Sequence, residues 1–303
     1  MKYTVLYKES VNSALDYVLS MLPNRIRTGI YSWLETNKYE LNELRFKKNT
    51  FLTVIAGLNN VKTDVYVTEN DIESILFNLC DGSIYAHFDT IKNGYIRLKQ
   101  GARAGICGRA SEENGLISGI SDITSINIRI PKLISGAGDY LYSFMSKSSF
   151  NKSVLLYSLP GIGKTTILRD FSLKLSQGNK FIRYAIIDTR EEITPLIAEN
   201  IIADVYLSYP KGLAIELATK SMTPELIICD EISSTDEASA ILRAANTGVT
   251  LLATAHAGSF YELIRKESIK MLIDGGVFEY FIGIDRKPGE KMYKYTLNSC
   301  EEI

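Results

Sequence analysis

The stretch that decides the fold runs from Val154 to Leu175 and reads VLLYSLPGIGKTTILRDFSLKL. Its apolar start, 154–157, predicts a buried parallel strand. Apolar residues then repeat at helical spacing after the loop, at Ile167, Leu168, Phe171 and Leu175. Between the two lies a glycine-containing loop that ends in Lys164-Thr165-Thr166. A strand, a glycine loop, Lys-Thr and a helix in this order predict a phosphate-binding P-loop.

The residue types of this loop suit a phosphate chain. Backbone N–H groups from Gly161 to Thr165 can surround phosphate oxygens, and the helix N-terminus adds partial positive charge. Lys164 can reach the β- and γ-phosphates, and the Thr165 hydroxyl can ligate Mg²⁺. We therefore predict ATP and Mg²⁺ as cofactors, bound by the loop residues Pro160, Gly161, Ile162, Gly163, Lys164, Thr165 and Thr166.

One position departs from the motif G-x-x-x-x-G-K-[ST], because Ser158 stands where the first glycine is expected. That glycine serves the geometry of the turn more than the phosphate, so the departure weakens the match only slightly. The alternative interpretation is an ordinary glycine-rich turn before a helix.

The composition is that of a soluble globular protein, with 46% apolar and 23% charged residues in a chain of 303. The formal net charge of −1 shows no global attraction to nucleic acid, and we expect no nucleic-acid partner. The four cysteines have no C-x-x-C spacing, which disfavours a zinc site. No secretion signal or apolar span is visible, so we expect a cytoplasmic protein, peripheral at a membrane through its partners.

The pattern of the chain changes near residue 133. Residues 1–133 mix helical and alternating strand patterns and predict a smaller α+β domain. In residues 134–303, apolar strands alternate with helical stretches, at 154–157, 182–187, 226–229 and 250–254. This alternation predicts an α/β fold with a doubly wound parallel sheet.

Polar residues follow the ends of these strands, where ligands bind in open α/β sheets. Leu226–Glu231 has the Walker B form, in which Asp230 would hold Mg²⁺ and Glu231 would orient and polarise the attacking water. His256 ends the next strand and could sense the γ-phosphate. The alternatives are a pair of acids that cap the following helix and a loop histidine without a catalytic role.

The charged run Asp188-Thr189-Arg190-Glu191-Glu192 follows the strand after the P-loop helix. Its acids could form a second carboxylate site near the nucleotide. The alternative is a solvated charge run.

The P-loop half has no evident arginine to stabilise phosphoryl charge. Candidates precede it, at Arg97, Arg103, Arg109 and Arg129, and the last three are the catalytic candidates. In a ring, one or two of them could reach the γ-phosphate of a neighbouring subunit, and such arginines contribute roughly 10³–10⁵ in rate. The alternative is that they form ordinary salt bridges at the surface.

The chain resembles the stage III sporulation protein AA family of endospore-forming bacteria, which is itself similar to the secretion ATPases of type II and type IV systems. The resemblance covers nearly the whole chain. It is carried by the P-loop and by segments 43–45, 105–110, 125–130, 225–232 and 244–256. Two positions depart from it: Ser158 in the P-loop, and Thr189 where an acid is expected.

The resemblance implies a RecA-like P-loop ATPase domain behind an N-terminal domain, assembled as a hexameric ring. It implies an ATPase in the mother-cell cytoplasm that powers a channel to the forespore beside membrane proteins of the same sporulation operon. Two other functions stay open: a nucleic-acid-dependent ATPase, and a non-catalytic scaffold that uses ATP as a clamp. Neutral charge and the lack of a basic, aromatic-studded strand argue against the first, and Glu231 argues against the second.

Overall fold

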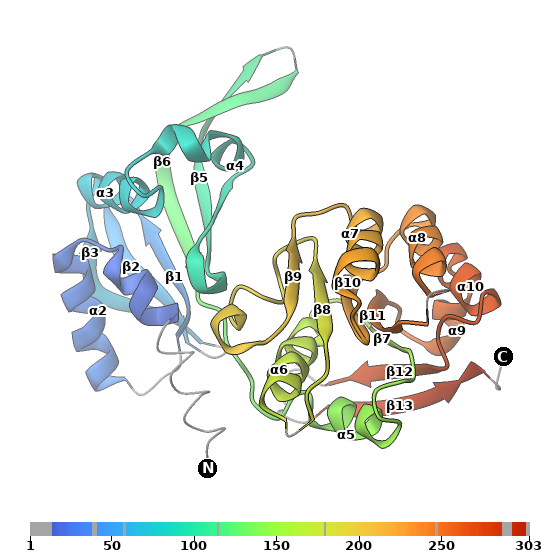
Figure 1. The fold of residues 1–303 in the computed structure, drawn as a ribbon. Coiled ribbons are helices and arrows are strands. Elements are labelled where there is room, and N and C mark those ends of the chain that lie inside the picture. The colour runs from blue at the N-terminus through green and yellow to red at the C-terminus, as the bar shows by residue number, and fades with distance from the viewer. Residues whose placement is uncertain are drawn as a thin grey trace. The chain divides into compact units, whose positions relative to one another are not determined.

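The computed structural model describes residues 14–37, 41–56, 59–113, 115–178, 180–245, 248–286 and 293–300. The chain divides into two compact units, Met1–Lys132 and Leu133–Ile303 (Figure 1).

The first unit is built on a six-stranded antiparallel sheet. Residues 43–45 and 53–55 pair as neighbouring strands, with Leu44 opposite Val54. Across the sheet the strands follow the order β3 (Asn59–Val67), β2 (Thr50–Ala56), β1 (Leu41–Lys47), β6 (Leu116–Arg129), β5 (Arg103–Glu113) and β4 (Tyr95–Arg97).

One face of this sheet is buried under helices. Alternate strand residues such as Leu44, Leu52 and Ile128 are fully buried, as the period of two requires. Residues 14–20 are helical. The other helices are α2 (Asn24–Thr36), α3 (Glu69–Leu79), the 3₁₀ turn η1 (Ile84–His87), α4 (Phe88–Lys92) and the 3₁₀ turn η2 (Lys99–Gly101). Thr68 and Asp71 form a reciprocal capping box that fixes the start of α3.

The second unit contains a seven-stranded sheet. All neighbouring strands are parallel except the last pair, β12 and β13. The sheet has the order β13 (Lys294–Ser299), β12 (Tyr280–Asp285), β7 (Val154–Ser158), β11 (Thr250–His256), β10 (Leu226–Glu231), β8 (Tyr184–Asp188) and β9 (Asp204–Leu207). The four predicted strands are present, and β9, β12 and β13 are additional.

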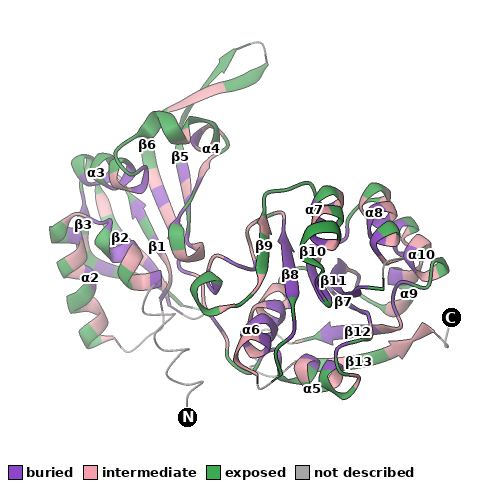
Figure 2. Cartoon of the chain, in the orientation of Figure 1, coloured by how far each residue is buried: buried purple, intermediate pink, exposed green. Residues whose placement is uncertain are grey.

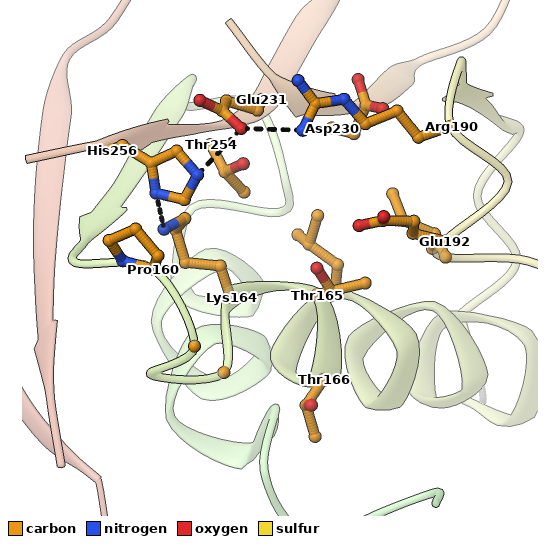
Figure 3. Close-up of a pocket in the computed structure, with 14 residues that line it drawn as sticks. Pro160, Lys164, Thr165, Thr166, Arg190, Glu192, Asp230, Glu231, Thr254 and His256 are labelled. Carbon is orange, nitrogen blue, oxygen red and sulfur yellow. Dashed lines mark hydrogen bonds and ion pairs between the residues drawn. The ribbon is translucent and has the colours of Figure 1, made fainter. Parts of the chain in front are cut away.

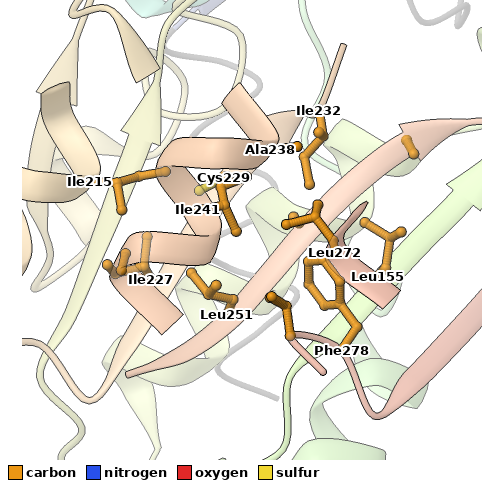
Figure 4. Close-up of a cluster of buried hydrophobic side chains, with 14 of the residues drawn as sticks. Leu155, Ile215, Ile227, Cys229, Ile232, Ala238, Ile241, Leu251, Leu272 and Phe278 are labelled. Atoms are coloured by element: carbon orange, nitrogen blue, oxygen red, sulfur yellow. The ribbon is translucent and has the colours of Figure 1, made fainter. Parts of the chain in front are cut away.

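Helices cover both faces of this sheet, and its central strands are buried, whereas the edge strands β9 and β13 are largely not (Figure 2). On one face, Ile215, Ile241, Leu272 and their neighbours pack on Leu155, Ile227 and Leu251 in one apolar cluster (Figure 4). The helical elements are α5 (Asp139–Lys147), α6 (Lys164–Gln177), η3 (Ala198–Asn200), α7 (Lys211–Leu217), η4 (Ala218–Met222), α8 (Thr235–Ala245), α9 (Phe260–Ile264) and α10 (Glu267–Asp274). Each fully buried Leu, Ile or Phe stabilises this core by about 1.5–3 kcal/mol.

The parallel arrangement decides where polar residues meet. Because β7, β8, β10 and β11 run in the same direction, their carboxyl ends lie along one edge of the sheet. Ser158, Asp188, Glu231 and His256 are the last residues of these strands. Four segments far apart in the chain therefore end beside the start of α6.

Candidate nucleotide site

The P-loop lies between the end of β7 and the start of α6, as the sequence predicts. Gly161 and Gly163 have φ angles of 78° and 127°, which residues with a Cβ rarely adopt. A Cβ on Gly163 would lie 2.5 Å from the Tyr293 hydroxyl oxygen. The loop backbone can therefore take this conformation only with glycine at these positions.

A cavity of about 400 Å³ opens beside this loop, within the size range of small-molecule sites. It brings together the predicted residues Lys164, Thr165, Asp230, Glu231 and His256. Its lining comprises Pro160, Gly161, Gly163, Lys164, Thr165, Thr166, Leu168, Arg190, Glu192, Ile193, Asp230, Glu231, Thr254 and His256. Of the predicted loop residues, Ile162 instead lines a neighbouring pocket with Leu159 and Phe260.

Polar side chains form a continuous chain of contacts across the cavity (Figure 3). Lys164 Nζ lies 2.8 Å from His256 Nδ1, and His256 Nε2 lies 2.9 Å from Glu231 Oε2. Arg190 Nη1 donates to the same Glu231 oxygen at 3.2 Å. An ammonium group only donates and a carboxylate only accepts, so the contacts assign a neutral His256 with its proton on Nε2.

Lys164 is buried, and its ammonium group is held by the loop itself. It donates to the Ser158 carbonyl at 3.0 Å and to the Ser158 hydroxyl at 3.2 Å. Burial lowers the pKa of Lys164 to about 8, against the opposing attraction of Glu231. The serine that replaces the first motif glycine thus contributes a hydrogen bond to the P-loop lysine.

Asp230 is paired with a lysine that sequence reasoning missed. Lys211 Nζ lies 2.8 Å from Asp230 Oδ1 and 3.3 Å from Glu237 Oε1. Burial raises the pKa of Asp230, and the attraction of Lys211 opposes that rise. Lys211 is the first residue of α7, whereas Asp230 lies near the end of β10. The spacing between the two matches no motif that could have identified the lysine.

Asp188 contradicts the interpretation of the charged run as a solvated one. It is fully buried and accepts hydrogen bonds from the backbone N–H groups of Glu192, Ile193 and Thr194 at 2.8–2.9 Å, and from the Thr194 hydroxyl at 2.8 Å. It is therefore neither solvated nor part of the cavity lining. Its role is to fold the loop that follows β8.

That folded loop carries Arg190 and Glu192 into the cavity wall. The expectation that the P-loop half has no arginine beside the site is wrong. Arg190 forms an ion pair with Glu231, although its own side chain remains 56% exposed. A motif search misses Arg190 because its position depends on the turn that Asp188 organises.

The candidate arginines of the N-terminal half belong to the first unit. In the strand register, Arg129 lies opposite Glu43 of β1 and opposite Arg103 of β5. Arg103 in turn lies opposite Arg97 of β4. Arg129 Nε also forms an ion pair with Glu43 Oε1 at 3.1 Å. Arg109 lies beyond a bulge that separates it from Cys107, in the exposed part of the β5–β6 hairpin.

The residues of the cavity fit a magnesium nucleotide. Glycines clear space around a helix N-terminus, and Lys164 and Arg190 supply positive charge. Asp230 Oδ2 is buried and has no hydrogen-bond donor among the described residues, so a carboxylate oxygen is free for a metal or its water shell. The described part of the chain holds no cluster of three His, Cys, Asp or Glu side chains suited to a metal.

Comparison with known proteins agrees with this geometry. Residues 14–298 match the model of the family described as Sporulation stage III, protein AA. Stage III sporulation protein AA of Bacillus subtilis (strain 168) is 29% identical over 286 residues, which cover 91% of this chain and 92% of that protein.

Two solved structures are similar in fold. The pilus retraction motor PilT with bound ADP has a TM-score of 0.63 at 14% identity, over 89% of this chain and 82% of that one. The ATPase DotB of Yersinia pseudotuberculosis has a TM-score of 0.61 at 16% identity, over 89% and 78%. The predicted fold class is thereby confirmed: a RecA-like P-loop unit behind an α+β unit.

In the described parts of the chain, no helix has the length and apolar character needed to cross a membrane.

Proposed function

The chain belongs to the family Sporulation stage III, protein AA, and we propose that it is an ATP-hydrolysing motor or assembly ATPase for a sporulation channel between mother cell and forespore. One observation carries the proposal: Lys164, Asp230 and Glu231 line a single cavity at the carboxyl edge of a parallel sheet. That combination supplies a cation to bind the phosphates, a ligand for the metal and a carboxylate to orient the attacking water.

Each of these residues has a distinct task in hydrolysis. The N–H groups of the loop and the Lys164 ammonium would bind the phosphates, and Thr165 and Asp230 would hold Mg²⁺. When bound, Mg²⁺ would neutralise charge on the phosphate oxygens. Glu231 would orient and polarise the attacking water, since its carboxylate faces the cavity and is only 19% exposed.

Arg190 and His256 would control when Glu231 can act. Both bond to the same carboxylate oxygen, Glu231 Oε2. A phosphate group that recruits Lys164 would remove its contact with His256, and one that recruits Arg190 would release the carboxylate. The contacts thus link occupation of the phosphate site to the catalytic group.

Arginines from a neighbouring subunit would complete the site in a hexameric ring. Arg97, Arg103 and Arg129 are exposed and adjacent across three strands. A row of guanidinium groups could stabilise charge on phosphoryl oxygens. Arg103 and Arg129 are therefore stronger candidates than Arg109.

A second candidate function, a nucleic-acid-dependent ATPase, gains support from the same sheet. On the face of the sheet that carries the exposed arginines, a cavity of about 510 Å³ is lined by Arg45, Lys47 and Phe51, among others. Phe51 and Tyr66 are partly exposed and in edge contact at 5.5 Å. Basic and aromatic side chains from different strands thus form a surface that no single strand reveals. Stimulation of turnover by single-stranded DNA or RNA would favour this function.

The test of the leading proposal combines turnover with mass. We expect the protein to hydrolyse ATP with Mg²⁺ and to form a ring whose mass is that of six subunits. We further propose that it is cytoplasmic and reaches the membrane through membrane proteins of the channel. A folded protein that neither binds nor hydrolyses ATP, alone or with those partners, would refute the proposal.

A further inference from the structure

Lys211 is the most deeply buried cation of the site, with a side chain only 2% exposed. It is the first residue of α7 and points at the end of β10. Its ammonium group contacts the Asp230 and Glu237 carboxylates at 2.8 and 3.3 Å and also donates to the Glu231 carbonyl oxygen. One side chain thus contacts both residues of the Walker B pair.

The surroundings keep this lysine charged. Burial disfavours its charge, but the Asp230 and Glu237 carboxylates outweigh that effect and raise the pKa of Lys211. Glu237 is itself held in place, since its Oε2 accepts from the Ser233 backbone N–H at 2.7 Å and from the Ser233 hydroxyl at 3.0 Å. The lysine is therefore a built component of the structure and not a mobile surface cation.

We propose that Lys211 is a positioning residue. Its contacts fix the end of the Walker B strand, and its positive charge weakens the binding of Mg²⁺ by Asp230. The inference rests on the proposed ATPase function and concerns the regulation of the same site. Asp230 Oδ1 is engaged by the ammonium group, whereas Oδ2 has no donor among the described residues. A divalent ion at Oδ2 would be repelled by the nearby positive charge.

Two consequences follow from this arrangement. Without the charge of Lys211, Mg²⁺ should bind more tightly, so the metal should increase nucleotide affinity by a larger factor. Without the negative charge of Glu237, the same factor should decrease. A residue with a merely structural role would loosen the site in both variants and would not move the factor in opposite directions.

The experiment measures the affinity for ADP with Mg²⁺ and with EDTA, and the metal enhancement is the ratio of the two. For Lys211→Met the ratio should rise by at least about tenfold, the smallest effect expected when a unit charge about 5 Å from a divalent ion is removed, because burial weakens the screening by water. For Glu237→Gln, which can still accept from Ser233, the ratio should fall by a similar factor. Lys211→Arg keeps the charge and should stay close to wild type.

An unchanged ratio in both charge variants, or a change in the same direction, would overturn the proposal. If Lys211→Met does not fold, Glu237→Gln alone decides, because the proposal requires its ratio to fall. Failure of the ATPase proposal is a separate result: wild-type protein would bind no ADP, and Lys164→Ala would change nothing. ADP binding that depends on Lys164 but has a metal ratio insensitive to charge would refute only the role of Lys211.

Discussion

His256 Nδ1 lies 2.8 Å from Lys164 Nζ, and the same imidazole contacts Glu231 through Nε2. A single neutral ring therefore joins the lysine proposed to bind phosphate to the carboxylate proposed to orient water. Any ligand that attracts the Lys164 ammonium must compete with this contact.

Lys164→Ala should lower ATP affinity by about a hundredfold, because two charge-assisted hydrogen bonds at roughly 1.5 kcal/mol each are lost. The fold should persist, since the strands of the sheet do not depend on this side chain. Nucleotide titration and circular dichroism check both points. Lys174→Ala is the matched control, because Lys174 lies on the same helix and pairs with Asp139. Equal affinity in folded Lys164→Ala and wild-type protein would exclude the loop as the site.

Glu231→Gln should bind ATP normally and hydrolyse it roughly 10²–10⁴-fold more slowly, because the amide cannot take a proton from water. Its amide oxygen can still accept from Arg190. Single-turnover hydrolysis beside equilibrium binding separates the two effects. Loss of binding and turnover together would indicate a structural role.

His256→Ala should lower kcat without weakening ATP binding, since the imidazole positions Glu231 and its contact with Lys164 competes with phosphate. We expect a decrease of roughly tenfold, the loss of one hydrogen bond to a charged group. His87→Ala controls for the loss of a histidine outside the site. A large rise in KM with unchanged kcat would instead make His256 a binding residue.

ATP affinity should fall above pH 8. Lys164 has a pKa of about 8, lowered by burial, so its ammonium form predominates below that value and is lost above it. Each pH unit above the pKa of the free protein should reduce affinity by up to about tenfold, until the pKa of the complex is reached. Affinity measured at pH 7, 8, 9 and 10 checks this. Lys164→Ala should show no such decline, and a wild-type profile that is flat to pH 10 would contradict the assignment.

Turnover per subunit should rise with protein concentration if arginines act across a subunit boundary. A mixture of Lys164→Ala with Arg103→Ala should recover activity that neither variant has alone, because each supplies what the other lacks. Arg129→Ala should behave like Arg103→Ala, whereas Arg109→Ala should remain near wild type. Turnover that does not depend on concentration, without recovery in any mixture, would refute a shared site.

The sequence by itself determined the features that depend on neighbouring residues. The strand, glycine loop and helix of 154–175 are local, because apolar periodicity and backbone freedom act over a few residues. The same reasoning located Asp230, Glu231 and His256 at strand ends. The capping box at Thr68 is equally local, because two residues three positions apart create it.

Only the tertiary structure decided which charges meet. Arg190 reaches Glu231 because buried Asp188 folds the turn that carries it, and Lys211 reaches Asp230 because α7 packs against α8 and against β8, the neighbour of β10. The row of Arg97, Arg103 and Arg129 exists only once strand register is set. Charge attraction and repulsion depend on distance in space, and no motif spacing encodes distances between segments that the chain brings together by burying its apolar core.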